Sequence, residues 1–215
     1  MKTYHKLYTD GAWSAPNASG TLAVENPATE ELIARVAAGS AEDAARAVRA
    51  ASAAFPAWSA TPAQQRAAYL DKIAEGLSER RADIACSICE EVGMPLKLSE
   101  RIQAALPPQL TAGYAALLRE YSFEERMSNS LVIREAAGVA ACVTPWNYPL
   151  HQVMAKVAPA LAAGCTVVLK PSELAPLTAY LLAEVIDAAG VPPGVFNLVC
   201  GTGPVVGEAL AADPA

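Results

Sequence analysis

The fold is decided by residues 138–200, which read GVAACVTPWNYPLHQVMAKVAPALAAGCTVVLKPSELAPLTAYLLAEVIDAAGVPPGVFNLVC. In this stretch, apolar β-branched runs alternate with segments long enough for helices. Strands that alternate with such helices indicate βαβ units and a parallel sheet. The sequence therefore predicts an α/β protein whose parallel sheet is half of a doubly wound, Rossmann-like one. We expect strands at Val139–Val143, Cys165–Leu169 and Val195–Cys200, with helices at about Pro149–Ala163 and Pro176–Ala189.

The residues before this stretch are predicted to be mostly helical, after a short arm of strands and turns. Gly and Pro residues interrupt the first 30 residues, which indicates the arm. A helix is expected from the capping residue Ser40 to Phe55, where Pro56 ends it. Three more helices are expected: one that opens at Thr61 and Pro62, one over Ala82–Val92 and one within residues 99–121.

These patterns divide the chain into three regions. Residues 1–127 form the arm and the helical part, residues 128–138 a strand-like connector, and residues 139–215 the first βαβαβ half of a dinucleotide-binding domain. Three parallel strands alone leave an edge and a face of the sheet uncovered. We therefore expect these residues to be the amino-terminal part of a longer protein, and to self-associate or aggregate in isolation.

The composition excludes several classes of protein. The chain has 215 residues, of which 53% are hydrophobic and 18% charged, so disorder is excluded. A net charge of −6 argues against a nucleic-acid partner. The best apolar run, Val157–Leu169, is too short for a membrane span and contains Pro159 and Gly164. Because the start lacks an apolar leader and the cysteines number five, we expect reduced thiols and a cytoplasmic location.

Ligands of open α/β sheets bind beyond the carboxyl ends of the strands, where this chain has three turns. They read TPWNYP (144–149), KPSE (170–173) and GTGPVVG (201–207). An acidic residue just after the second strand is placed to hold the ribose hydroxyls of a dinucleotide. Glu173 is therefore a candidate, with Lys170 beside it as a donor to ribose or phosphate. The alternative interpretation is a solvated Lys–Glu pair.

The other two turns each allow two interpretations. Gly201, Gly203 and Gly207 are spaced one residue wider than the dinucleotide fingerprint, so they indicate either an anion-binding helix start or a tight strand-to-helix turn. In the first turn, the amide of Asn147 is suited to donate a hydrogen bond to a developing oxyanion. Alternatively, Asn147 caps the next helix and Trp146 packs.

No metal site or nucleophile is predicted from the residues themselves. Cys86 and Cys89 form a C-x-x-C motif inside a helical pattern, without a second pair of ligands nearby. Cys142, Cys165 and Cys200 lie in or at the ends of predicted strands and are interpreted as packing residues. The two histidines have no Ser or Cys partner at a recognisable spacing.

Taken together, the three turns resemble those of the NAD(P)-dependent aldehyde dehydrogenases. Residues 138–210, from GVAACVTPWNYP to GTGPVVGEAL, are similar to the amino-terminal cofactor domain of that family. Residues 26–75, from NPATEEL to LDKIAE, are similar to its upstream region. The family binds its cofactor without the standard glycine fingerprint, which accounts for the unusual glycine spacing.

The resemblance implies a role for each matching residue. Asn147 would donate its amide to the aldehyde oxygen, and Lys156 would support the catalytic centre. The adenosine ribose would be held by Lys170, Ser172 and Glu173. The rest of the cofactor site would consist of Val143, Pro145 and Trp146, which line the cleft, and of Gly203, Pro204 and Gly207, which cover the adenine side.

The resemblance also implies a reaction: a homo-oligomeric enzyme oxidises an aldehyde to a carboxylic acid with NAD(P)+ through a cysteine thioester. NAD is expected to be preferred over NADP, because the Glu173 carboxylate would repel a 2′-phosphate. No cysteine of this chain matches the context of the family's nucleophile, which lies downstream. The 215 residues alone are therefore expected to be inactive. The alternative is a truncated, non-catalytic nucleotide-binding or interaction protein.

Overall fold

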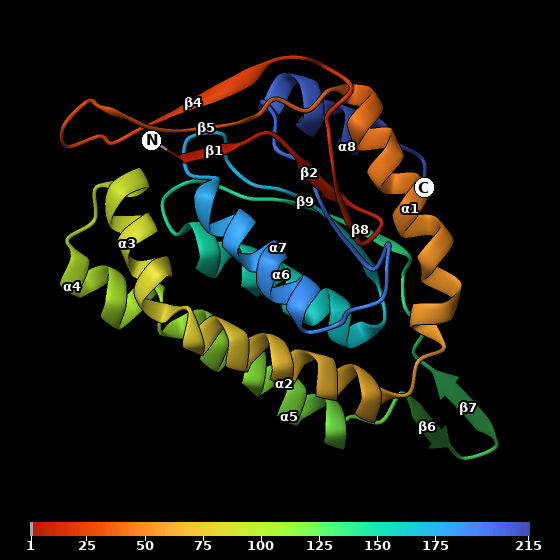
Figure 1. Ribbon diagram of the computed structural model, residues 1–215. Helices are drawn as coiled ribbons and strands as arrows, with labels where there is room; N and C mark the ends of the chain where they lie inside the picture. Colours follow the sequence, from red (N-terminus) through yellow and green to blue (C-terminus); the bar gives the residue numbers. More distant parts are fainter. Residues whose placement is uncertain (1) are drawn as a thin grey trace.

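The structure is a computed structural model that describes residues 2–215, and its centre is a five-stranded sheet (Figure 1). The predicted parallel strands are confirmed as β8 (Val139–Val143), β9 (Thr166–Lys170) and β10 (Phe196–Leu198). β9 lies between the other two and is buried along its whole length, as a strand covered on both faces must be. The α/β, Rossmann-like fold class is thereby confirmed.

One edge of the sheet is extended by a hairpin whose place in the sheet the sequence patterns did not predict. β2 (Leu7–Thr9) pairs antiparallel with β10 and with β3 (Ala12–Ser14), so the strand order is β3-β2-β10-β9-β8. Asn197 fixes this junction: its Oδ1 accepts from the Asp10 N–H at 3.0 Å, and its Nδ2 donates to Val167 O at 3.1 Å. The expectation of a bare three-stranded sheet is therefore wrong. Within the described residues, β8 forms one edge of this sheet and β3 the other.

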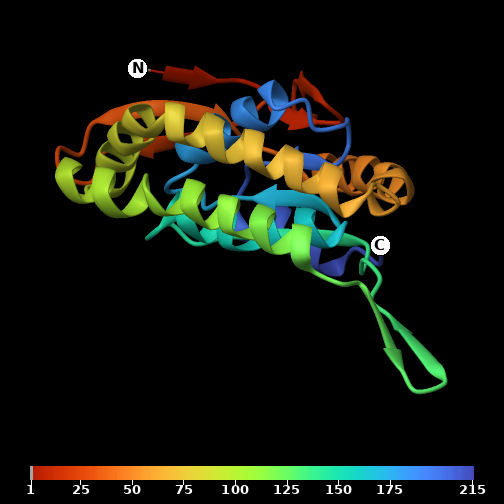
Figure 2. The same cartoon turned by 90° about the horizontal axis from the view of Figure 1, so that it is seen from below.

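Helices cover both faces of the sheet. α6 (Pro149–Ala163) and α7 (Leu177–Ala188) pack on one face, whereas α1 (Ala41–Ser59) covers the other, with the short α8 (Glu208–Ala212) against it. α2 (Ala63–Glu79) and α5 (Leu106–Glu120) run side by side and form a further layer outside α6 and α7 (Figures 1 and 2). One cluster of buried hydrophobic side chains connects these layers.

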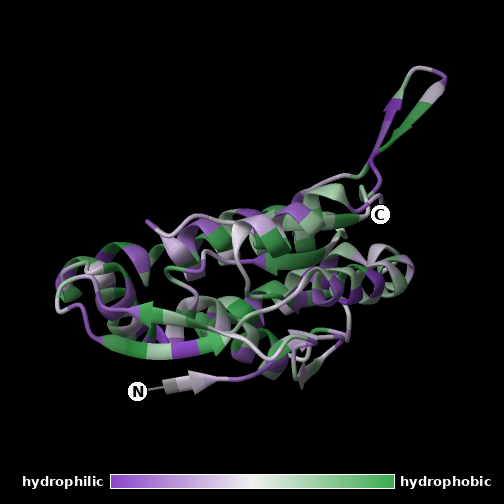
Figure 3. Cartoon of the chain, turned by 90° about the horizontal axis from the view of Figure 1, so that it is seen from above, coloured by the Kyte–Doolittle hydropathy of each residue, from purple (hydrophilic) through white to green (hydrophobic). Residues whose placement is uncertain are grey.

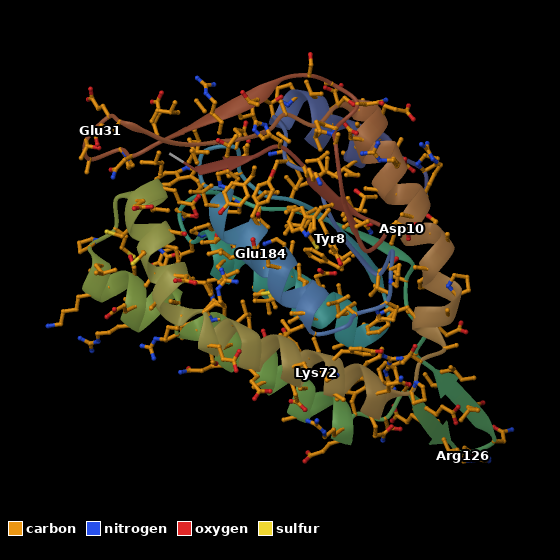
Figure 4. The ribbon with its side chains drawn as sticks, in the orientation of Figure 1. Tyr8, Asp10, Glu31, Lys72, Arg126 and Glu184 are labelled. Carbon is orange, nitrogen blue, oxygen red and sulfur yellow. The ribbon has the colours of Figure 1, made fainter. Side chains whose placement is uncertain are left out.

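Two smaller sheets lie outside the central one. The first consists of β1 (Lys2–Tyr4), β5 (Leu32–Ala37) and β4 (Thr21–Glu25). The second is a hairpin of β6 (Glu124–Met127) and β7 (Ser130–Ile133), which projects from the body and is exposed throughout (Figure 3). Figure 4 labels Arg126 on this hairpin. It begins at Glu124, before the connector that the sequence places at residues 128–138.

The first long helix does not end where the sequence suggested. α1 continues through Pro56 to Ser59, so the expectation that Pro56 ends the helix is wrong. Pro56 lies in the last turn, where the loss of one backbone donor costs little, and its carbonyl still accepts from the Ala60 N–H. Burial of Trp58, at 2% exposure, stabilises this last turn.

The next helices also differ in their boundaries. Pro62 is the cap of α2 and not its first residue, and Thr61 Oγ1 donates to Ala57 O instead of capping. α3 (Arg81–Val92) ends at Gly93 as expected, with the left-handed backbone (φ 74°) that glycine favours. The fourth helical region is divided into α4 (Leu96–Leu98), a π-helical turn η1 (Ser99–Gln103) and α5. None of the helices within residues 2–215 has the length and hydrophobicity needed to cross a membrane.

Candidate functional site

Three loops follow the carboxyl ends of β8, β9 and β10, and hydrogen bonds join them along one edge of the sheet. The Thr144 N–H, just after β8, donates to Lys170 O at 3.1 Å. In the loop after β10, the Gly203 N–H lies 3.4 Å from Oε1 of Glu173, which belongs to the loop after β9. The three turns singled out in the sequence therefore meet in space.

Lys170 and Glu173 form the most tightly held pair at this edge. The Lys170 residue is 2% exposed, and its Nζ donates to Glu173 Oε2 and to Pro171 O, each at 2.9 Å. Burial favours the neutral acid of Glu173, but hydrogen bonds from its own N–H and from Lys170 outweigh this, so the pKa of Glu173 is lowered. The interpretation as a solvated Lys–Glu pair is wrong for Lys170, whose ammonium group lies inside the fold. Glu173 remains a partly exposed, charged acceptor.

The glycines of the third turn differ in their surroundings. A Cβ on Gly201 would lie 2.2 Å from Val206 Cγ2, so this glycine allows the turn to pack tightly. No atom lies within 4 Å of the corresponding position at Gly203, and at Gly207 the nearest is Lys170 Cδ at 3.8 Å. Residues 203–207 form a π-helical turn, η2, which accommodates the extra residue in the glycine spacing. The tight-turn interpretation therefore holds at Gly201, while Gly203 and the exposed Pro204 border open space.

The first turn presents its side chains to solvent. Val143, Pro145, Trp146 and Asn147 are all exposed, and Trp146 is 50% exposed. The Asn147 side-chain amide has no hydrogen-bond partner within residues 2–215, and no side chain caps α6, which starts after Tyr148. The interpretations of Asn147 as a helix cap and of Trp146 as a packed residue are therefore wrong.

Within residues 2–215, the side chains of two further predicted residues form hydrogen bonds only inside their own segments. Ser172 is buried, and its Oγ accepts from the Leu174 N–H at 3.3 Å, which tightens the turn between β9 and α7. Lys156 is half-buried on α6 and its Nζ lies 3.3 Å from Gln152 O one turn back. The expected supporting role of Lys156 stays a prediction.

Sequence reasoning missed two buried polar residues beside these turns. Gln103, in η1, is fully buried and donates from Nε2 to Asn147 O at 3.3 Å, so it holds the backbone of the first turn. Glu91, in α3, is 4% exposed and accepts from the N–H groups at the start of α7. Glu91 also lines a cavity of about 440 Å³ together with Trp146 and Leu174. No local pattern distinguishes either residue from a surface position of a helix.

The five cysteines are all free, and three are buried in or beside the sheet. Burial raises the pKa of Cys142 to about 11 and that of Cys200 to about 12, so neither thiol ionises near neutral pH. Cys165 is buried as well, whereas Cys86 is exposed and Cys89 half-buried on α3. Within residues 2–215, no three His, Cys, Asp or Glu side chains are grouped so that they could hold a metal ion.

Comparison with known proteins shows which family shares this arrangement. A family model described as "Aldehyde dehydrogenase family" matches residues 13–215. A 3-succinoylsemialdehyde-pyridine dehydrogenase from a Pseudomonas species is 49% identical over 220 residues, which is all of this chain and 45% of that protein. A putative aldehyde dehydrogenase from Staphylococcus aureus is 44% identical, again over all of this chain and 45% of its own length. The chain thus spans about half the length of these relatives.

Solved structures agree with the sequence comparison. Aldehyde dehydrogenase C from Pseudomonas syringae, as a Cys-to-Ala mutant with NAD+ and octanal, superposes with a TM-score of 0.96 and is 50% identical. The match covers 98% of this chain and 43% of that one. Lactaldehyde dehydrogenase from Escherichia coli superposes with a TM-score of 0.94 at 38% identity, over 100% of this chain and 46% of that one.

Proposed function

Because the chain belongs to the aldehyde dehydrogenase family, we propose that it supplies the nucleotide half-site and the oxyanion donor of an NAD-dependent enzyme. This enzyme oxidises an aldehyde to a carboxylic acid through a cysteine thioester. The observation that carries the proposal is the junction of Lys170, Glu173 and Gly203 at the carboxyl edge of the sheet. Such an edge is where α/β sheets bind dinucleotides.

The residues at this junction fit the adenosine half of a dinucleotide. Glu173 is charged and 35% exposed at its side chain, so its oxygens can accept from the two ribose hydroxyls. The buried Lys170 ammonium fixes the Glu173 carboxylate, which limits the entropy lost on binding. The space beside Gly203 lets a ligand approach the backbone closely. When bound, NAD+ accepts the hydride from the substrate.

Asn147 is the proposed oxyanion donor. When a thiolate adds to an aldehyde carbon, the carbonyl oxygen acquires negative charge, and a fixed amide N–H stabilises it. The Asn147 amide is exposed and unpaired within residues 2–215, while Gln103 holds its backbone carbonyl at 3.3 Å. The side chain is therefore free to meet a substrate oxygen.

The nucleophile is assigned to residues outside these 215. Cys142, Cys165 and Cys200 are buried, and burial raises the pKa of Cys142 and of Cys200. Cys86 and Cys89 lie within the helix α3 and not in the three turns. We therefore expect the 215 residues to bind NAD(H) without turnover. Measurable NADH formation from NAD+ and octanal by this chain would overturn the assignment.

The nucleotide half-site is tested by titrating the 215-residue chain with NADH and following the fluorescence of the bound nucleotide. We expect saturable binding that Glu173→Ala weakens by about tenfold or more, equivalent to about 1.4 kcal/mol. Glu184→Ala is the matched control, because Glu184 is also half-exposed and ion-paired, with Arg80 at 3.1 Å, but lies on α7 (Figure 4). Absence of NADH binding, or an equal loss of NADH affinity in Glu173→Ala and Glu184→Ala, would contradict the proposal.

We also infer that the complete protein is a homo-oligomer. The exposed β6–β7 hairpin supports this proposal, because Met127, Leu131 and Ile133 are each at least 47% exposed and apolar. In sedimentation velocity, the chain is expected to form oligomers that are weakened when Leu131 and Ile133 are replaced by serine. A monomer at tens of micromolar for the unmodified chain would contradict this inference.

A further inference from the structure

The helix that follows the proposed ribose-binding turn has no cap of its own. α7 begins after Pro176, and no side chain of that residue accepts from the first turn. Instead, Glu91 of α3 performs this function across the fold: its Oε2 accepts from the Leu177 N–H at 2.7 Å, and its Oε1 lies 3.3 Å from the Thr178 N–H. The carboxyl group therefore satisfies two backbone donors that a helix start leaves unpaired.

Glu91 makes these contacts inside the protein. It is 4% exposed, and no salt bridge joins it to a basic side chain within residues 2–215. A buried carboxyl without a cation is costly unless hydrogen bonds satisfy it. The Leu177 and Thr178 N–H groups supply such hydrogen bonds, although burial outweighs them and raises the pKa of Glu91. The placement of Glu91 is thus coupled to the position of α7.

The turn between β9 and α7 is anchored at both ends. At its start, Lys170 is paired with β8 through the sheet register and accepts from the Thr144 N–H. At its end, Glu91 holds the first N–H groups of α7. Glu173 lies between the two anchors and must bend back to meet Lys170 Nζ and the Gly203 N–H. If the second anchor is lost, the turn can relax and Glu173 loses its fixed place.

We propose that Glu91 is a positioning residue for the nucleotide half-site, because its cap on α7 holds the turn 171–176 in the form that joins Glu173 to Lys170. The inference rests on the proposed function and adds a residue to it. Glu91 itself does not touch the nucleotide. Its effect is transmitted through the backbone of the turn.

Hydrogen exchange of the chain without nucleotide tests the positioning directly. We expect Glu91→Ala to increase exchange of the amides in residues 172–178 by at least about tenfold. Arg66→Ala is the matched control: Arg66 is equally buried, at 5%, and its Nε donates to Ala162 O, just before the opposite, amino end of β9. Arg66→Ala should increase exchange near Ala162 and leave residues 172–178 protected. An equal rise at residues 172–178 in both variants would overturn the proposal.

Nucleotide affinity supplies the second readout. Glu91→Ala should weaken the binding of both NADH and AMP by about tenfold, because AMP carries the same adenosine ribose. Arg66→Ala should leave both affinities unchanged. Glu91→Gln keeps one carbonyl acceptor for the Leu177 N–H. Its affinity for both nucleotides should therefore fall by only about threefold, a partial rescue. The Gln variant decides the question if the Ala variant does not fold. Unchanged AMP affinity in both Glu91 variants would overturn the proposal.

The two readouts also separate this inference from the function on which it rests. If the unmodified chain binds neither NADH nor AMP, the proposed function fails, and the exchange experiment alone decides whether Glu91 fixes the turn. If the unmodified chain binds nucleotide and Glu91→Ala frees the turn without weakening AMP, the positioning role is wrong while the nucleotide site stands.

Discussion

The turns after β9 and after β8 lie side by side at one edge of the sheet, but they differ in how completely the chain itself holds them. In the turn after β9, Lys170 is 2% exposed and bonded to Glu173, and Glu91 caps the helix that follows. In the turn after β8, Trp146 and Asn147 are exposed, and the Asn147 side chain has no partner within residues 2–215. We call the turn after β9 (residues 171–176) the held turn, because contacts within the chain fix it. We call the turn after β8 (residues 144–149) the open turn, because its side chains are exposed.

This difference matches what each turn is proposed to do. Binding a nucleotide requires fixed acceptors before the ligand arrives, since ordering them on binding would reduce affinity. An oxyanion donor must instead be left unpaired, so that the substrate oxygen becomes its acceptor. The held turn therefore fits the nucleotide half-site, and the open turn fits the catalytic donor.

The largest expected effect concerns the choice of nucleotide by the held turn. We expect NADH to bind this chain more tightly than NADPH by about tenfold to a thousandfold, or about 1.4–4 kcal/mol, because the Glu173 carboxylate repels a 2′-phosphate. Glu173→Gln should reduce the difference between NADH and NADPH affinity by improving NADPH binding, because Lys170 and Ser172 lie beside the same position. Titration of the unmodified chain and of Glu173→Gln with NADH and with NADPH measures this difference in affinity. Tighter NADPH binding by the unmodified chain would show that Lys170 and Ser172 decide the preference.

The packing of the third turn predicts a contrast between two glycines. Gly201→Ala should destabilise the fold by about 3 kcal/mol, because its Cβ would lie 2.2 Å from Val206 Cγ2 and 3.2 Å from Gly39 O. Gly203→Ala should cost less than about 1 kcal/mol, since no atom lies within 4 Å of its Cβ position. Urea unfolding of the two variants gives both values. Equal destabilisation by the two substitutions would contradict the difference in packing between Gly201 and Gly203.

The buried cap predicts a pH dependence of stability. Burial raises the pKa of Glu91 from 4.5 to about 8, although the Leu177 and Thr178 N–H groups act against it and Glu90 adds to it. Between these pH values the folded state retains a proton that the unfolded state has lost, so stability falls as pH rises, by up to about 1.4 kcal/mol per pH unit. Above pH 8 this contribution to the slope disappears.

Urea unfolding from pH 5 to pH 9 measures this slope, and Glu91→Gln is the control because it cannot ionise. In this variant, most of the fall in the free energy of unfolding between pH 5 and pH 8 should disappear. A decline of the same steepness in the Gln variant would assign the pH dependence to other groups and remove Glu91 as its source.

The smallest effect is expected at the open turn. Asn147→Ala should change the free energy of unfolding by less than about 0.5 kcal/mol, because the side chain is exposed and makes no hydrogen bond within residues 2–215. NADH binding should also be unchanged to within about twofold. Unfolding and titration on the same preparation test both statements. A clear loss of stability would mean that Asn147 has a structural role.

The sequence predicted the central elements because their signals are local. The alternation of apolar runs and helix-length segments located β8, β9, α6 and α7 to within one residue at each end. The position of Glu173 just after a buried strand identified the held turn. The family resemblance accounted for the wider glycine spacing, but the π-helical turn that carries it was not predicted, because such a turn has no local signature.

The parts that the sequence missed depend on distant partners. Glu91 lies 86 residues from Leu177, and Gln103 lies 44 residues from Asn147, so no spacing rule connects them. The three-residue strand β2 is too short for a periodicity, although Asn197 fixes it at the sheet edge. Likewise, Pro56 stays inside α1 because tertiary burial of Trp58 outweighs the local preference.

We propose that the turns after β9 and β10 bind the adenosine part of a nucleotide, beside an open turn that presents Asn147. The most direct test is to titrate the isotope-labelled 215-residue chain with AMP and, separately, with nicotinamide mononucleotide, following every backbone amide by nuclear magnetic resonance. We predict that AMP shifts the amides of residues 170–176 and 201–207 and leaves Trp146 and Asn147 unchanged, while nicotinamide mononucleotide causes no saturable shift. No shift with AMP, or shifts centred on residues 144–149, would contradict the account.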